Sequence, residues 1–291
     1  MKKKIAILGS TGSIGKNTIN ILKKDKKNIK IVLLTSNKNI KEILKQQKIF
    51  NVQNLIITDK SKFKIIKDIS KKRNFKVYNN YECLKKIFKN KIDYVMAAIT
   101  GISGLEPTLK IIKYSKIIAI ANKESIVCAW NLVSKELRKN NTEFIPVDSE
   151  HFSIWEILKG FKINNVEKIY ITASGGPLLN LPIKKIKKIS KKETLKHPNW
   201  SMGKKISIDS CTMMNKVFEV IEAQRIFNLP SNKIEILVHP KSYLHSIVKF
   251  KNGTVKLLIH EADMKIPIFN TLYGNTEKSI NTKKINFKKL N

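Results

Sequence analysis

Two acids, a hydroxyl and an imidazole occupy four consecutive positions, 148–151, within the motif Pro-Val-Asp-Ser-Glu-His. The motif follows an apolar segment typical of a β-strand, in which residues two apart share a face. We therefore expect Asp148 and Glu150 to point together, with Ser149 on the other side. Converging carboxylates repel each other unless a proton or a cation lies between them, so a hard divalent metal is the favoured explanation.

Two other interpretations of this motif stay open. A Ser-His-Asp triad is disfavoured, because its side chains must line up in space and neighbours in one strand do not easily do so. A polar strand end that caps a following helix through Asp148 or Ser149 would need no ligand.

A second polar group follows at residues 209–219. Asn215 and Glu219 are four residues apart on a predicted helix and so share a face, next to Lys216. Ser210, Asn215 and Lys216 near a helix start suit a phosphate, and Glu219 could complete a carboxylate metal site. Taken alone, Glu219 would be a surface ion-pair partner. The apolar residues expected to form the core face of this helix are Val217, Phe218, Val220 and Ile221.

Two loops could contribute to the same chemistry. Ser174-Gly-Gly-Pro follows a predicted strand and could bind phosphate through backbone N–H groups, or be an ordinary turn. His197-Pro-Asn-Trp-Ser-Met-Gly203 carries large apolar side chains in a long connection. It is interpreted as a mobile lid that excludes water, or as a local hydrophobic anchor.

The elements that would position these groups begin with a dinucleotide-binding pattern. Residues 5–8 predict a buried strand, Gly-Ser-Thr-Gly-Ser-Ile-Gly follows at 9–15, and a helical pattern comes next. This order is that of a Rossmann unit, whose glycines let a pyrophosphate approach a helix N-terminus. A tight turn without a ligand is the alternative.

The next strand, at residues 29–34, predicts the cofactor. NAD-specific folds place an acid near its end to bind the ribose 2′-hydroxyl, but here the chain continues Thr-Ser-Asn-Lys-Asn. Lys38 lies where a 2′-phosphate could be bound, which predicts NADPH. Further apolar strands at 93–99 and 116–121 suit a parallel sheet. Lys123, in Asn-Lys-Glu-Ser after the last of them, is at a strand end where such sheets bind ligands.

The predicted fold class is α/β, with an N-terminal Rossmann-like parallel sheet domain followed by an α+β catalytic domain. We expect the first at residues 1–145 and the second at 146–274, with a linker at 275–291. Strands are predicted at 234–238, 246–250 and 254–259, the last two joined by an Asn-Gly hairpin. The nearby histidines, His239, His245 and His260, are interpreted as structural.

Composition limits the function class. The net charge of +35 would attract polyanions, but only three of the 57 basic residues are arginine, the residue that base readout favours. We interpret the charge as solvated lysine and expect no nucleic-acid partner. Three cysteines without CxxC spacing fit a reducing, cytoplasmic setting, and no apolar run is long enough for a membrane helix.

Taken in order, the motifs GSTGSIG, NKES, PVDSEH, SGGP, HPNWSMG and DSCTMMNK resemble those of the 1-deoxy-D-xylulose 5-phosphate reductoisomerase family, over essentially the whole chain. The resemblance implies NADPH and Mg²⁺ or Mn²⁺ as cofactors. It implies that the following residues contact NADPH: Thr11, Gly12, Ser13, Ile14, Asn37, Lys38, Asn39, Asn122, Glu124 and Gly203. It implies metal ligation by Asp148, Glu150 and Glu219. It implies that substrate is bound by Lys123, Ser149, Glu150, Ser174, His197, Ser210, Asn215, Lys216 and Glu219.

The resemblance also implies a reaction. A divalent metal would stabilise enolate charge while the carbon skeleton of a small phosphorylated sugar rearranges, with Lys123 and Glu150 as catalytic groups that move protons. NADPH would then reduce the rearranged aldehyde to 2-C-methyl-D-erythritol 4-phosphate, a precursor of isoprenoids, and Trp200 would help exclude water. Family members are expected to be homodimers and to continue into a C-terminal helical domain, of which this chain would carry only the linker.

Two rival functions remain for the same residues. A semialdehyde dehydrogenase-like enzyme would share the first half but needs a cysteine nucleophile in a defined loop, which neither Cys128 nor Cys211 provides convincingly. A nucleic-acid-binding protein would explain the charge, yet it leaves the glycine loop and the acidic motif unexplained.

Overall fold

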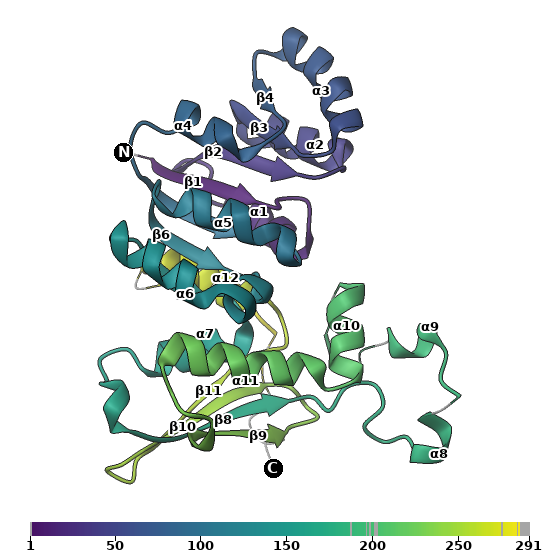
Figure 1. The fold of residues 1–291 in the computed structure, drawn as a ribbon, viewed down its shortest axis with the longest axis vertical. Coiled ribbons are helices and arrows are strands. Elements are labelled where there is room, and N and C mark those ends of the chain that lie inside the picture. Colours follow the sequence, from purple (N-terminus) through teal and green to yellow (C-terminus); the bar gives the residue numbers. More distant parts are fainter. Residues whose placement is uncertain are drawn as a thin grey trace. The chain divides into compact units, whose positions relative to one another are not determined.

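The protein divides into two compact units, Met1–Val147 and Asp148–Asn291. In the computed structural model, shown in Figure 1, the described residues are 2–186, 188–195, 197, 199–200, 203–274, 276–283 and 285. Each unit has its own sheet. None of the described helices combines the length and the apolar character that a membrane span requires.

The first unit is built on a seven-stranded parallel sheet in the order β4-β3-β2-β1-β5-β6-β7. Its strands are β1 (Lys3–Leu8), β2 (Ile29–Ser36), β3 (Asn54–Ile57), β4 (Lys76–Tyr78), β5 (Ile92–Ala97), β6 (Ser115–Ile120) and β7 (Glu143–Pro146). The strand order reverses between β1 and β5, which is the switch point where such sheets bind ligands. The predicted Rossmann-like parallel sheet is confirmed; the short edge strand β4 was not predicted.

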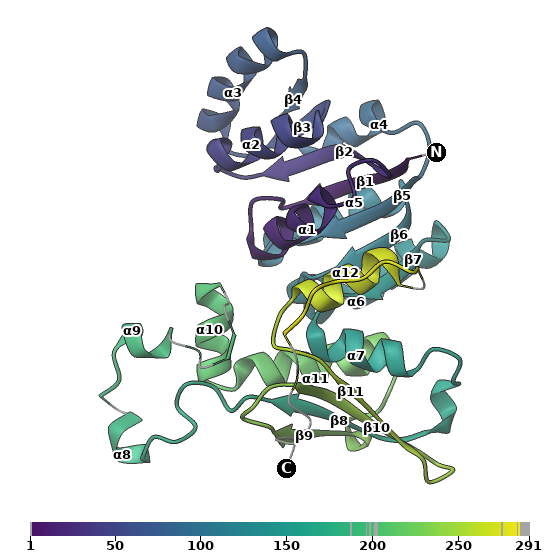
Figure 2. The same ribbon diagram turned by 180° about the vertical axis from the view of Figure 1, so that it is seen from behind.

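Helices cover both faces of this sheet. Figure 1 shows α5 and α6 on one face, and Figure 2 shows α1 on the other. The helices are α1 (Ser13–Lys23), α2 (Ile40–Phe50), α3 (Lys60–Arg73), α4 (Leu84–Ile87), α5 (Leu105–Ile112) and α6 (Lys123–Lys139), with short 3₁₀ turns at Tyr81–Cys83 and Ile102–Gly104. Burial on both faces explains why β1 and β5 are continuous apolar runs.

Asparagine and aspartate set the ends of several of these helices. Asn39 and Asp59 begin α2 and α3 by accepting hydrogen bonds from backbone N–H groups three residues on. Asn51 and Asn74 end the same helices with positive φ angles of 51° and 50°. Asparagine tolerates this left-handed conformation better than most residues, so it can replace glycine as a helix terminator here.

The second unit contains a mixed four-stranded sheet in the order β11-β10-β8-β9. Its strands are β8 (Val166–Ala173), β9 (Ile234–Val238), β10 (Leu244–Phe250) and β11 (Val255–Ile259). Strands β8 and β9 are parallel, whereas β10 is antiparallel to both β8 and β11. Gly253 has φ +84° in the turn of the predicted β10–β11 hairpin.

One face of this sheet is covered by two helices. The helices of the unit are α7 (Ser149–Ile157), α8 (Ile183–Ile186), α9 (Lys191–Thr194), α10 (Lys204–Cys211), α11 (Met214–Phe227) and α12 (Lys265–Tyr273), with 3₁₀ turns at Ile163–Asn165 and Ser231–Lys233. Ile154 of α7 and Ala223 of α11 pack with Ile169, Ile171 and Val248 of the sheet. This shared core holds α7 and α11 together, and the predicted metal ligands lie on these two helices and at their ends.

The structure describes part of the predicted linker at 275–291. Residues 275, 284 and 286–291 lie outside the described part of the chain, and the described residues from 276 onward belong to no helix or strand.

Candidate active site

The glycine loop of the first unit connects β1 to the N-terminus of α1. A Cβ on Gly9 would lie 2.6 Å from the carbonyl oxygen of Ala98, and one on Gly15 would lie 2.4 Å from the carbonyl oxygen of Gly9. These two glycines are therefore required for packing. Gly12 is the N-cap of α1, and no side chain of the described residues caps this helix. Its N–H groups are thus available to an anion.

The predicted cofactor residues lie around this loop. Thr11 is linked to Ser36 at the end of β2 by a 2.9 Å hydrogen bond, which ties the glycine loop to the next strand. Beyond β2, Asn37 donates to the Thr58 hydroxyl at 2.8 Å. Lys38 has 71% of its side chain exposed, with its ammonium 3.9 Å from Asp59. A lysine so exposed can reach an added phosphate.

The strand end after β6 is more tightly constrained. Asn122 is the N-cap of α6: its Oδ1 accepts from the Ser125 N–H at 2.6 Å, and its Nδ2 donates to the Gly101 carbonyl at 2.8 Å. The side chain thereby joins the loops that follow β5 and β6. Lys123 begins α6 and is only 8% exposed, unlike most lysines of the chain.

In the second unit, the three predicted metal ligands come together. Ligand oxygens of Asp148, Glu150 and Glu219 lie within 4.8 Å of one another. All three donors are hard carboxylate oxygens, the ligand type that Mg²⁺ and Mn²⁺ prefer. The residues present therefore fit a divalent cation.

The local geometry that brings Asp148 and Glu150 together differs from the prediction. The extended segment ends at Val147, Asp148 is the N-cap of α7, and Ser149 is its first residue. Asp148 Oδ1 accepts from the Glu150 N–H at 3.3 Å, and the Ser149 hydroxyl donates to Glu150 instead of pointing away. The strand alternation was wrong because a helix starts within the motif; the cap predicted as an alternative is present.

Lys216 lies within the carboxylate cluster. Its ammonium is 3.3 Å from Glu150 Oε1 and also donates to Glu219 Oε2 and to the Thr172 carbonyl. Burial disfavours the charged lysine, but the field of Glu150 and Glu219 outweighs it and raises the pKa of Lys216. The side chain is 7% exposed, so these contacts stabilise its charge.

Helix α11 buries a polar face. Lys216, Glu219 and Glu222 follow one another every three residues and are all buried, whereas Val217 is 45% exposed. The predicted apolar core face of this helix was therefore wrong at Val217. The polar residues turn inward because they pair with one another and with α7, which compensates for their desolvation. Asn215 donates to Glu219 from the same helix, in the predicted i, i+4 relation.

His151, which the sequence analysis considered only in the disfavoured triad, is buried. Its Nδ1 is 3.2 Å from Asp148 Oδ1 and 3.8 Å from Glu222 Oε2, and its Nε2 is 2.8 Å from the carbonyl oxygen of Glu219. Burial alone would lower the pKa of His151, but Glu222 and Asp148 raise it to about 9. Glu222 was missed as well; its three-residue spacing from Glu219 was the available signal.

The predicted phosphate loop is organised by Ser174 and His197. The Nδ1 of His197 accepts from the N–H groups of Asn199 and Trp200 at 3.2 and 3.0 Å, so its proton is on Nε2, which donates to Ser174 Oγ at 2.9 Å. Ser174 in turn accepts from the Gly176 N–H at 3.1 Å. Burial lowers the pKa of His197, in agreement with a neutral ring.

The predicted lid is anchored at its described residues. Asn199 donates to Ser242 Oγ at 2.9 Å and also to the Pro240 carbonyl. The rings of Trp200 and His245 form an edge-to-face pair, with centroids 5.9 Å apart. The remaining lid residues, 198, 201 and 202, lie outside the described part of the chain, and Gly203 begins α10 as its N-cap. Ser210 lies in the last turn of α10, with its carbonyl against Gly176.

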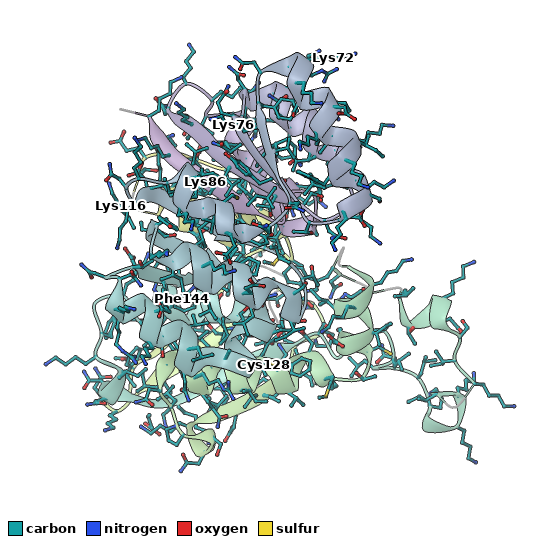
Figure 3. The ribbon with its side chains drawn as sticks, turned by 45° about the horizontal axis from the view of Figure 1, so that its top comes forward. Lys72, Lys76, Lys86, Lys116, Cys128 and Phe144 are labelled. Atoms are coloured by element: carbon teal, nitrogen blue, oxygen red, sulfur yellow. The ribbon has the colours of Figure 1, made fainter. Side chains whose placement is uncertain are left out.

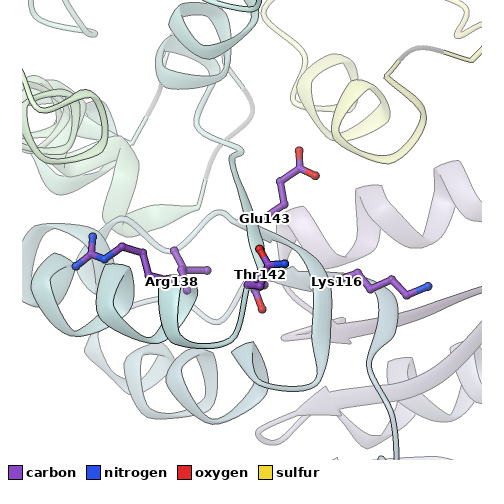
Figure 4. A pocket seen from close by; sticks show the side chains of 6 residues that line it. Lys116, Arg138, Thr142 and Glu143 are labelled. Carbon is purple, nitrogen blue, oxygen red and sulfur yellow. The ribbon is translucent and has the colours of Figure 1, made fainter.

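A separate surface pocket of about 450 Å³ lies in the first unit. Figure 4 shows its lining side chains Lys116, Arg138, Thr142 and Glu143. Lys116 and Glu143 are at the amino ends of β6 and β7, and Arg138 is near the end of α6, whereas the predicted cofactor residues follow the carboxyl ends of strands. The Lys116 ammonium is 2.8 Å from Asp93 and so already has a counter-ion. This pocket is not the candidate active site.

Comparison with known proteins identifies relatives of both units. Residues 5–130 match the family model for 1-deoxy-D-xylulose 5-phosphate reductoisomerase, and residues 144–227 match the model for the C-terminal domain of that enzyme. A curated 1-deoxy-D-xylulose 5-phosphate reductoisomerase of Pelagibacter ubique is 62% identical over 291 residues, covering 99% of this chain and 75% of the relative.

Solved structures agree with the sequence relatives. The reductoisomerase of Zymomonas mobilis in complex with NADPH superimposes with a TM-score of 0.90 at 34% identity, covering 100% of this chain and 75% of that one. A second reductoisomerase, solved with NADPH, fosmidomycin and magnesium, gives a TM-score of 0.88 at 34% identity, with coverages of 95% and 71%.

Proposed function

The chain belongs to the 1-deoxy-D-xylulose 5-phosphate reductoisomerase family, and on that premise we propose which residues perform the family's reaction in this protein. The function is the NADPH-dependent isomerisation and reduction of 1-deoxy-D-xylulose 5-phosphate to 2-C-methyl-D-erythritol 4-phosphate, with a divalent metal. We assign residues 1–145 to the cofactor and residues 146–274 to the substrate and metal.

The observation that carries the assignment is the cluster of Asp148, Glu150 and Glu219, whose ligand oxygens lie within 4.8 Å of one another. The three carboxylates carry three negative charges, of which Lys216 offsets one, and a divalent cation would offset the other two. When bound, this cation supplies Lewis-acid stabilisation of negative charge on a substrate oxygen, and NADPH supplies the hydride.

The residues of the chain then have separate tasks. Glu150, whose Oε2 accepts from Ser149, is the carboxylate proposed to move a proton at the substrate hydroxyl. Lys123, at the start of α6 in the first unit, is the second group proposed to move protons. Trp200 in the lid is proposed to exclude water from the reacting carbonyl.

The substrate phosphate is proposed to bind Ser174, His197, Ser210, Asn215 and Lys216. His197 Nε2 and the Ser174 hydroxyl already form a hydrogen-bonded pair, and both can turn their donors to phosphate oxygens. Lys216 brings a buried positive charge held by acids of the proposed metal set, so one side chain links the proposed phosphate and metal subsites.

NADPH is proposed to bind where the first unit exposes free helix N–H groups and a lysine. Gly12 at the start of α1 would face the pyrophosphate, and Lys38 would face the 2′-phosphate. The other proposed contacts are Thr11, Ser13, Ile14, Asn37, Asn39, Asn122, Glu124 and, from the second unit, Gly203.

We further propose that the protein works in the cytoplasm as a homodimer. Its three cysteines are free thiols, which suits a reducing compartment. An apolar stripe on the second sheet supports self-association: Tyr170, Ile247 and Leu257 are register partners across β8, β10 and β11 and share the face opposite the helices. Leu257 is 53% exposed there.

The test of the metal assignment is NADPH oxidation with 1-deoxy-D-xylulose 5-phosphate and Mg²⁺, comparing wild type with Glu150→Gln. Removing one carboxylate that binds metal and moves a proton should lower kcat by about 100-fold or more. EDTA should abolish the wild-type rate.

The matched control is Glu156→Gln, because Glu156 lies on the same helix and pairs with Lys159 at the surface at 2.7 Å. It should retain the wild-type rate, since exposed ion pairs contribute little. Undiminished turnover by Glu150→Gln, or turnover that resists EDTA, would contradict the assignment.

A further inference from the structure

We propose that His151 and Glu222 are positioning residues: together they fix the distance between the two helices that carry the carboxylate cluster, and thereby set its metal affinity. The proposal rests on the assignment of Asp148, Glu150 and Glu219 as metal ligands. Neither His151 nor Glu222 is among those ligands.

The geometry makes His151 a link between α7 and α11. Asp148 caps α7 and Glu219 lies on α11, so no local turn fixes their separation. His151 is fully buried and reaches both: Nδ1 is 3.2 Å from Asp148 Oδ1, and Nε2 is 2.8 Å from the Glu219 carbonyl oxygen. One rigid ring thus connects the carboxylate of Asp148 with the backbone of Glu219.

The ring has a second buried acidic neighbour. Glu222 Oε2 is 3.8 Å from the same Nδ1 that faces Asp148, and Glu222 is 2% exposed. Glu222 follows Glu219 by three residues on the buried face of α11, so it approaches the ring from the same helix.

Groups behind metal ligands tune metal affinity because they orient the ligand atoms. Loss of such a partner typically weakens metal binding about 10- to 100-fold. Without His151, Asp148 could rotate and α11 could shift relative to α7. Without Glu222, the ring would lose the side chain of α11 that lies beside Nδ1. Both changes should therefore act on the same step, the assembly of the cluster.

The experiment measures Mn²⁺ binding to the full chain without substrate, from the electron paramagnetic resonance signal of free Mn²⁺. The variants are His151→Gln, Glu222→Gln, the double variant and Glu156→Gln as the surface control. Each single change should weaken binding about 10-fold or more, and the double variant should be no weaker than the weaker single, because the two residues act as one unit. Glu156→Gln should bind as wild type does.

Three results would overturn the proposal. Wild-type affinity in either single variant would mean that the pair does not position the ligands. Independent, additive losses would mean that the residues act separately. Two Mn²⁺ ions per chain, with one lost in His151→Gln, would mean that Asp148, His151 and Glu222, whose ligand atoms also lie within 4.8 Å of one another, form a metal site of their own.

A metal titration of the reaction separates positioning from mere folding. If the pair positions ligands, Glu222→Gln should need about 10-fold more Mn²⁺ for half-maximal activity and reach the wild-type kcat at saturation. A structural defect would instead lower kcat at every metal concentration, and that result counts against the proposal.

Asp148→Asn distinguishes this failure from failure of the proposed function. If Asp148→Asn binds Mn²⁺ as wild type does, the ligand assignment is wrong and the positioning role falls with it. If Asp148→Asn loses Mn²⁺ while His151→Gln and Glu222→Gln keep it, only the positioning role fails.

Discussion

The ammonium of Lys216 forms ion pairs with two carboxylates, those of Glu150 and Glu219. Three carboxylates in one cluster carry three negative charges, and the ammonium of Lys216 lies beside two of them. Lysine suits this place because its ammonium has three donors in different directions, here used by Glu150, Glu219 and the Thr172 carbonyl. A planar guanidinium would pair with one carboxylate in a plane and leave the others less well satisfied.

The exposed side chain of Lys38 leads to a prediction about cofactor choice. Its side chain is exposed and only 3.9 Å from Asp59, a contact too weak and too solvated to hold it in place. Lys38→Ala should therefore raise KM for NADPH about 10-fold through loss of one charge-assisted contact, and leave KM for NADH unchanged. Steady-state kinetics with both cofactors measure this.

Lys41→Ala is the matched control, because Lys41 is an exposed lysine on α2, three residues further along. It should change neither constant. An equal rise of both constants in Lys38→Ala would show that Lys38 does not discriminate the 2′-phosphate, and the NADPH preference would then need another residue.

At the scale of elements, the strands and helix α11 were predictable, but the face that α11 buries was not. The strand at 234–238 agrees with β9 (Ile234–Val238), and the apolar runs at 5–8 and 116–121 lie at β1 and β6 to within a few residues. Continuous burial leaves such runs few alternatives. By contrast, α11 buries Lys216, Glu219 and Glu222, and hydrophobic spacing cannot reveal a face buried by charge pairing.

In the candidate site too, some features were predictable from the sequence and others were not. Asp148, Glu150 and Glu219 were named from residue type and resemblance, and they do converge. The backbone conformation that brings Asp148 and Glu150 together was not predictable, because a helix begins at Ser149 in place of the expected continuation of the strand. The contacts of His151 and Glu222 were missed because they depend on the packing of α7 against α11. The three-residue spacing of Glu222 from Glu219 indicates a shared helix face but not the partner on α7.

The strands of the second sheet carry a buried histidine pair with a consequence for stability. His245 of β10 and His260 after β11 stack with ring centroids 3.6 Å apart, and His245 Nε2 is 3.1 Å from the His260 carbonyl oxygen. Burial lowers the pKa of His245 to about 4, and burial with the neighbouring ring lowers that of His260 to about 3. Both rings are therefore neutral in the fold at neutral pH.

Acidification should destabilise this sheet. The unfolded imidazoles take up protons as pH falls below about 6.5, whereas the folded ones do so only near pH 4 and below. Between these limits the unfolded state binds more protons, so stability falls with pH by up to about 1.4 kcal/mol per pH unit for each ring. Urea unfolding of the full chain between about pH 7 and about pH 5 measures the slope.

His260→Asn should flatten this slope, because one of the two rings no longer titrates. The partly buried His239 is the comparison, and His239→Asn should change the slope less. A slope that is the same in wild type and His260→Asn would mean that the acid sensitivity comes from the carboxylates instead.

At the scale of the whole molecule, the charge of +35 bears on self-association. Most lysines are exposed, as Lys72, Lys76 and Lys86 are in the first unit, where Figure 3 labels them. Two copies with such surfaces repel each other, although salt screens the repulsion beyond about 8–10 Å. Any contact between copies should therefore use a surface whose lysines are neutralised.

The second sheet offers such a surface. Lys168 pairs with Glu235 across β8 and β9, and Lys249 pairs with Glu167 across β10 and β8 at 2.6 Å. The lysines of these strands are thus balanced by acids beside the apolar stripe of Tyr170, Ile247 and Leu257. An apolar centre with a neutralised surround is typical of protein interfaces.

Leu257→Asp tests whether this stripe joins two copies. Sedimentation equilibrium at physiological salt should give twice the chain mass for wild type and one chain mass for Leu257→Asp, because the substitution buries a carboxylate in the interface. Leu132→Asp is the matched control: Leu132 is 55% exposed on α6, against 53% for Leu257, and should leave the dimer intact. Monomeric wild type, or dimeric Leu257→Asp, would exclude the stripe as the interface, whereas a monomer formed only by Leu257→Asp would assign it.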